Sequence, residues 1–177
     1  MGTITANFFI ALDGVVEAPD QWHFPYFDDD MGAVVGAGLD STEAFLMGRT
    51  LYDEWAAYWP GSDDEPAAFF NAVPKYVISS SLENPSWNNT TVVPGDAAAV
   101  QRLKKEVEGD IGMSGSATTV RWLLAEGLLD QLRLLVHPIV VGHGQRLFED
   151  GPTHPLRLVD SATLSSGVLS LLYAPAS

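Results

Sequence analysis

The chain contains no cysteine among its 177 residues. Disulfide bonds, zinc sites with thiolate ligands and a cysteine nucleophile are therefore excluded. Basic residues are also scarce, because nine lysines and arginines stand against 23 acidic residues and leave a net charge of −14. Nucleic acids and anionic membrane surfaces bind through basic patches, so neither is expected as a partner.

Long apolar runs are missing as well. No segment approaches the roughly 20 apolar residues that a membrane-spanning helix needs, and the N-terminus lacks the basic segment of a signal peptide. We therefore expect a cytoplasmic protein. With 46% hydrophobic residues, a chain of this length can fill one sizeable core, which predicts a single domain over residues 1–177. The four histidines show no metal-ligand spacing with carboxylates, so no metal site is predicted.

Segments with strand and helix patterns alternate along the chain. Strands are predicted at 3–11, 42–47, 76–78, 90–93, 111–113 and 132–141, the last interrupted by Pro138. Helices are predicted at 31–39, 52–55, 67–71, 97–107 and 116–126, and residues 15–30 form a long aromatic loop. Two strands near 156–164 and 167–173 should pair antiparallel. This order predicts an α/β fold with a mostly parallel sheet, an antiparallel C-terminal edge hairpin and helices on both faces.

Two predicted strands end in groups suited to phosphate binding. Gly48-Arg49-Thr50 lies where a strand gives way to a helix, so backbone amides and the helix dipole favour an anion there. Arg49 adds a bidentate phosphate donor. Ser79-Ser80-Ser81 follows the next strand and offers three hydroxyls to a phosphate monoester. Taken alone, either segment also fits an ordinary polar turn.

A third glycine-containing junction lies at Ser114-Gly115-Ser116, between a buried strand and a helix. Because Gly115 has no Cβ, the backbone can approach a pyrophosphate closely, while Ser116 and Thr118 can cap the helix.

Asp13 is the acidic residue at the end of the first strand, beside the aromatic loop that contains Trp22 and Phe27. It fits a turn-forming role in Asp13-Gly14 and equally a polar contact to a substrate or a proton relay. Asp28 is a rival acid, although an acidic run before a helix is more often an N-terminal cap.

Four blocks in this order, Leu12–Gly14, Leu46–Asp53, Lys75–Leu82 and Ser114–Ala117, resemble the dihydrofolate reductase superfamily. The segments Gly127–Leu132 and Pro138–Gly144 are similar to the reductase domain of bacterial riboflavin biosynthesis and its stand-alone relatives. The resemblance covers residues 3–173 and implies a three-layer, dihydrofolate reductase-like fold. No His-x-Glu and Cys-x-x-Cys pattern of a deaminase domain is present.

The resemblance implies an NADPH-dependent reductase that transfers hydride to a small heterocyclic, carbonyl or imine substrate, and a homodimer that covers the apolar C-terminal strands. The implied cofactor-binding residues are Ala11, Gly48, Arg49, Thr50, Ser79, Ser80, Ser81, Gly115, Ser116, Ala117 and Thr118. Asp13 is the implied catalytic residue, and Trp22, Phe27 and Asp28 are the implied substrate contacts. His143 receives no role. A nucleotide-binding module without turnover is the alternative.

Two positions depart from the family pattern. Ser80 stands where the family often has an arginine for the 2′-phosphate of NADPH, and Lys75 or Arg102 are candidates to replace it. Ser116 replaces the second glycine of a Gly-Gly pair whose peptide bond is often cis, which predicts a trans bond here.

Overall fold

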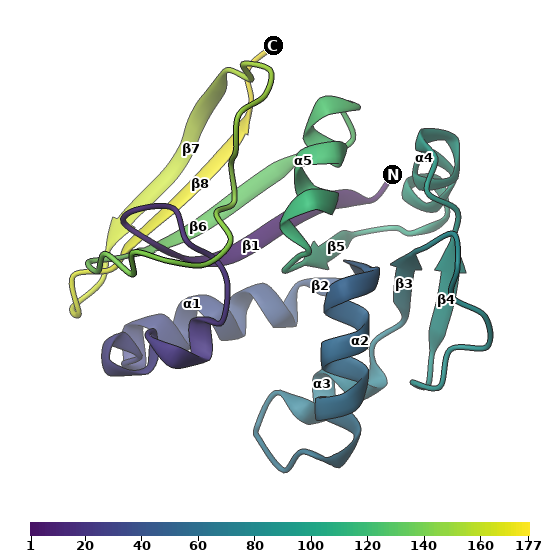
Figure 1. Ribbon diagram of the computed structural model, residues 1–177, viewed down its shortest axis with the longest axis horizontal. Coiled ribbons are helices and arrows are strands. Elements are labelled where there is room, and N and C mark those ends of the chain that lie inside the picture. The colour runs from purple at the N-terminus through teal and green to yellow at the C-terminus, as the bar shows by residue number, and fades with distance from the viewer.

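The computed structural model describes residues 1–177 and has an eight-stranded sheet at its centre (Figure 1). The strands are β1 (Thr3–Ala11), β2 (Thr42–Gly48), β3 (Lys75–Ile78), β4 (Thr90–Val93), β5 (Asp110–Met113), β6 (Gln131–His137), β7 (Leu156–Thr163) and β8 (Leu169–Pro175). Their order in the sheet is β4-β3-β2-β5-β1-β6-β8-β7. Strands β1 to β6 are parallel, whereas β8 pairs antiparallel with both β6 and β7. The predicted sheet type is therefore confirmed.

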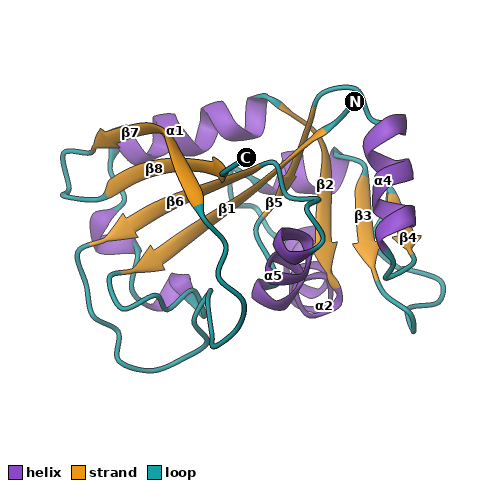
Figure 2. Ribbon diagram, turned by 90° about the horizontal axis from the view of Figure 1, so that it is seen from above, coloured by secondary structure: helices purple, strands orange, loops and turns teal.

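Helices cover both faces of the sheet (Figures 1 and 2). They are α1 (Asp29–Asp40), α2 (Arg49–Tyr58), α3 (Ala67–Ala72), α4 (Ala97–Glu106) and α5 (Ala117–Ala125), with short 3-10 helices at η1 (Pro19–Gln21), η2 (Phe24–Tyr26) and η3 (Trp59–Gly61). Alternate residues of β1, from Ile4 to Ile10, share a core with α4 and α5. A second core lies between the sheet and α2 and α3, and a third lies under α1. None of the helices is both long and apolar enough to span a membrane.

Two elements differ by more than two residues from the predicted bounds. The strand expected over 132–141 ends at His137, because Pro138 cannot donate to the sheet and restricts the residue before it. The helix expected over 52–55 already begins at Arg49 and continues to Tyr58. Within the C-terminal hairpin, β8 lies between β6 and β7, so β7 is the edge strand.

The carboxyl ends of β1 to β6 lie at one edge of the sheet, because these strands are parallel. The segments that follow β1, β2, β3, β5 and β6 therefore gather there. Ligands of open α/β sheets bind at this edge. The four sequence blocks that resemble the dihydrofolate reductase superfamily all include residues at this edge.

Candidate active site

The N-termini of α2 and α5 lie side by side at the carboxyl edge of the sheet (Figure 2). Gly48, the last residue of β2, makes this approach possible. A Cβ at Gly48 would overlap the hydroxyl oxygens of Ser116 and Thr119 and would lie 3.3 Å from the Ser116 backbone nitrogen. The close packing of the two helix starts therefore requires a residue without a side chain at position 48.

No side chain caps either helix at this point. Gly48 precedes α2 and has no side chain, and Ser116 precedes α5 without bonding to its backbone. The expectation that Ser116 or Thr118 caps α5 is wrong. The Ser116 hydroxyl instead pairs with the Thr119 hydroxyl at 3.1 Å, and the Thr118 hydroxyl accepts from Arg121 at 3.3 Å. First-turn amides of two adjacent helices thus remain for another acceptor, which is the donor set that a diphosphate needs.

The Gly115–Ser116 peptide bond is cis, so the expected trans bond is also wrong. Gly115 has a φ of +144°, which suits a residue without Cβ, and its carbonyl accepts the Gly48 amide at 3.3 Å. This hydrogen bond joins segments that are far apart in the sequence, whereas the expected trans bond follows from the intrinsic preference of the bond alone.

Arg49 connects the end of β2 to the segment after β3. Its Nε donates to Asp53 at 2.9 Å, and its NH1 donates to the Ser81 hydroxyl at 3.2 Å. The Ser79 hydroxyl accepts the amides of Ser81 and Leu82 and so holds the serine segment in place, while Ser80 is exposed. Two of the predicted phosphate-binding segments are therefore brought together in space.

Lys75 cannot replace the missing arginine at Ser80. It is only 1% exposed, and its Nζ donates to the Phe70 and Val73 carbonyls at 2.7 and 2.8 Å while lying over the Trp87 ring. Burial lowers the pKa of Lys75 to about 8. The prediction fails because the carbonyls at the end of α3 and the Trp87 ring enclose this side chain.

Asp13 lies where the ends of β1 and β6 meet. Its carboxylate accepts the Gly142 amide at 2.8 Å and the Val141 amide at 3.3 Å, and its carbonyl accepts from Arg146 at 2.9 Å. The Gly142 amide is the main cause that lowers the pKa of Asp13. An ionised Asp13 can hold the segment after β6 but has no proton to supply at neutral pH. Its catalytic role stays a prediction.

Aromatic rings and two histidines fill the carboxyl ends of β1 and β6, and we call the rings of Phe9, Trp22, His23, Phe24, Tyr26, Phe27 and His137 the aromatic cluster. His23 stacks on Phe9 with ring centroids 4.5 Å apart, and His137 meets Trp22 edge-on at 5.1 Å. His137 is completely buried and His23 is 7% exposed. His137 Nδ1 bonds to the Leu135 carbonyl at 2.8 Å, whereas His137 Nε2 and His23 Nδ1 have no partner.

The predicted substrate contacts divide into two groups. Trp22 and Phe27 belong to the aromatic cluster, and the predicted cofactor residue Ala11 lies beside it, opposite His137 in the sheet. Asp28 instead caps α1, because its carboxylate accepts the Met31 amide at 3.0 Å. Sequence reasoning missed His23 as a member of the cluster, although its position between Trp22 and Phe24 was a visible signal.

The sequence profile of the RibD C-terminal domain matches residues 2–170. The chain belongs to this family. A curated relative, the uncharacterized protein YyaP of Bacillus subtilis (strain 168), is 30% identical over 177 residues that cover 96% of this chain and 93% of YyaP.

Solved structures show the same fold in proteins of low sequence identity. A putative riboflavin biosynthesis protein from Shewanella sp. PV-4 superposes with a TM-score of 0.81 at 18% identity, covering 99% of both chains. The dihydrofolate reductase of Enterococcus faecalis, complexed with NADP(H), superposes with a TM-score of 0.68 at 11% identity, covering 99% of this chain and 97% of the other. The predicted dihydrofolate reductase-like fold is therefore confirmed.

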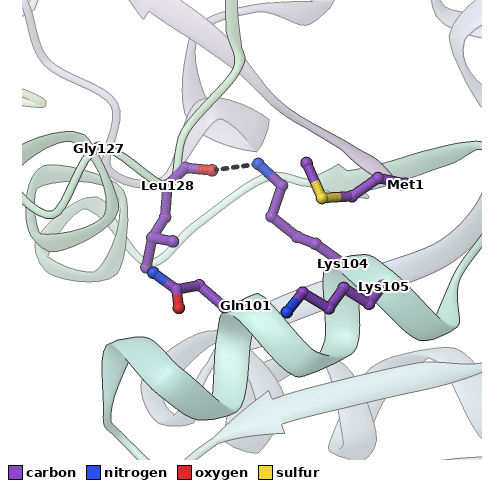
Figure 3. A pocket seen from close by; sticks show the side chains of 6 residues that line it. All are labelled: Met1, Gln101, Lys104, Lys105, Gly127 and Leu128. Atoms are coloured by element: carbon purple, nitrogen blue, oxygen red, sulfur yellow. Dashed lines mark hydrogen bonds between the residues drawn. The ribbon is translucent and has the colours of Figure 1, made fainter.

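A surface pocket of this RibD C-terminal domain lies at the opposite, amino-terminal edge of the sheet (Figure 3). Its lining residues are Met1, Gln101, Lys104, Lys105, Gly127 and Leu128. The buried Lys104 ammonium donates to the Leu128 carbonyl at 3.2 Å and pairs with Asp130 at 2.6 Å. Because this cation is already neutralised and none of the predicted cofactor- or substrate-binding residues lies there, the ion pair has a structural role.

The two buried histidines make stability depend on pH. Burial is the main cause that lowers the pKa of both His23 and His137, so the unfolded chain binds protons at higher pH than the folded chain. The contribution of these two histidines to the free energy of unfolding should therefore be fully present above about pH 6.5, and it should be lost as the pH falls below this value. Replacing His23→Phe, which keeps a ring in the stack, should flatten this loss in urea unfolding. The exposed His154→Phe should retain it, and equal pH slopes for all three proteins would contradict the assignment.

Proposed function

We propose that this protein is a cytoplasmic NADPH-dependent reductase, similar to 5-amino-6-(5-phosphoribosylamino)uracil reductase, that acts on a small planar heterocyclic, carbonyl or imine substrate. The observation that carries the proposal is the pair of uncapped helix N-termini packed against Gly48, with Arg49 bonded to Ser81 beside them. Uncapped helix N-termini beside a basic residue and hydroxyls form a donor set that suits a nucleotide diphosphate.

The residues present fit the cofactor. Amides at the starts of α2 and α5, those of Arg49 and Thr50 and those from Gly115 to Thr118, would hold the diphosphate, while Gly48 lets the two helix starts come together. Arg49 and the serines at 79–81 would hold the phosphate on the adenosine ribose. When bound, NADPH supplies the hydride. The aromatic cluster would orient a flat substrate and exclude water from it, since ring faces stack well on planar molecules.

Calorimetric titration with NADPH and NADH tests the cofactor, and loss of NADPH absorbance over a panel of aldehydes, quinones and reducible heterocycles tests turnover. We expect NADPH to bind more tightly than NADH and to be oxidised by at least one planar compound. If neither nucleotide binds, the cofactor site is rejected.

The second candidate is a nucleotide-binding module without turnover, which the engagement of both Asp13 oxygens by backbone amides favours. Asp13→Asn separates the two. If Asp13 handles substrate or a proton, the variant should bind NADPH with nearly unchanged affinity and lose turnover. Unchanged turnover would assign Asp13 only the role of holding the segment after β6, and absence of turnover in the parent across the panel favours the binding module.

A homodimer is part of the proposal. The edge strand β7 exposes Leu158 and Val159 by 53% and 43%, and an uncovered edge of this length is prone to pair with another chain. A symmetric dimer that covers β7 removes this hazard. Light scattering should give twice the mass of the chain at micromolar concentration, and the replacement Val159→Lys should shift the mass toward the monomer. A monomeric parent would defeat the prediction.

A further inference from the structure

Arg133 of β6 lies on the face of the sheet that α1 covers. It stands opposite Asn7 of β1, two residues before Leu135, which packs with Met31 of α1 in a buried cluster. Residues two apart in a strand point to the same face, so Arg133 shares this face with Leu135 and Phe9.

The charge of Arg133 has no partner within the chain. Its guanidinium donates to the Ser170 hydroxyl at 3.3 Å, and no carboxylate oxygen lies within 4.0 Å. Three other arginines pair with carboxylates, and the two that remain, Arg102 and Arg157, are exposed to water. Arg133 is therefore the one half-buried arginine without a carboxylate, in a chain with a net charge of −14. Desolvating a charge is costly unless an opposite charge compensates it, so this position suits an anionic ligand.

The position of the guanidinium limits the size of that ligand. The Arg133 guanidinium bonds to Ser170, and Ser170 pairs with Leu135 in the sheet. The Arg133 side chain therefore extends toward the carboxyl end of β6. Leu135 lies two residues, or about 7 Å, before His137, where the aromatic cluster begins. A flat molecule of one or two rings can span this length. Figure 2 shows β6 between β1 and β8 in the sheet.

We infer that Arg133 binds an anionic oxygen group of the substrate, so that the substrate is a planar molecule of one or two rings that ends in a carboxylate or a comparably acidic group. The inference rests on the proposed function for its assignment to a substrate. The rings would pack on the aromatic cluster while the anionic end reaches Arg133. Hydrogen bonds between ionised groups are about twice as strong as neutral ones, which makes this contact a determinant of specificity.

The test uses 2-naphthoate and its neutral amide, 2-naphthamide, as ligands in calorimetry. Neither is a substrate for reduction under these conditions, so binding is read independently of turnover and of NADPH. The parent protein should bind the acid at least about tenfold more tightly than the amide, as expected for one charge-assisted contact, and added salt should reduce this preference. Arg133→Gln should bring the ratio close to one without changing the affinity for the amide.

Arg157→Gln is the matched control, because it removes the same charge from an exposed arginine on β7 and should keep the preference. Arg133→Lys retains the charge and should keep part of the preference, which tests the contact even if Arg133→Gln folds poorly. Equal affinities for acid and amide in the parent, no binding of either, or an unchanged ratio in Arg133→Gln would overturn the inference. A protein that prefers the acid through Arg133 but oxidises no NADPH would instead refute the reductase proposal alone.

Discussion

Arg49→Ala should weaken NADPH binding about tenfold to a hundredfold, because a charge-assisted contact to phosphate typically contributes on the order of 1.5–3 kcal/mol. The guanidinium lies between Asp53 and Ser81, and no other basic side chain bonds to the serine segment. The affinity for NADH, which lacks the 2′-phosphate, should fall less. Because the contact is ionic, the difference between parent and variant should shrink as salt is added.

Lys105→Ala is the control for this prediction. Lys105 is an exposed lysine in the last turn of α4 without a carboxylate partner, and it lines the pocket at the opposite edge of the sheet, so its removal changes the net charge equally. It should leave the NADPH affinity within about twofold of the parent, as expected for a distant surface charge at moderate salt. Equal losses in the two variants would mean that overall charge, and not the position of Arg49, governs binding.

Gly48→Ala should reduce NADPH affinity by more than tenfold, which is the second large effect. The added Cβ would overlap the Ser116 and Thr119 hydroxyls and press on the Ser116 backbone, so the start of α5 must move away from α2. Overpacking of this kind costs about 1–3 kcal/mol of folding stability, and the displaced amides would no longer converge on one diphosphate. Calorimetry and thermal unfolding should both record the change.

Gly36→Ala provides a matched glycine control. A Cβ at Gly36, within α1, would have no heavy atom within 4 Å. Because alanine favours a helix interior over glycine, this variant should be stabilised by up to about 1 kcal/mol and should bind NADPH as the parent does. A Gly48→Ala variant that folds and binds NADPH normally would place the diphosphate elsewhere.

The sequence by itself determined the order and type of the main elements, since hydrophobic periodicity and turn residues are local signals. It also determined which segments follow the parallel strands, and therefore that Gly48, Ser81 and Gly115 lie at one edge of the sheet. The family followed from the same ordered motifs, and the family profile matches residues 2–170.

Tertiary structure alone decided the contacts between these segments. The Trp87 ring covers the Lys75 ammonium, and the contact of Gly48 with Ser116 and the cis bond after Gly115 occur where β2 touches α5. The absence of a carboxylate near Arg133 likewise depends on how β6, β8 and α1 come together. Such properties arise from pairing between residues distant in sequence, and local propensities contain no information about which distant groups will meet.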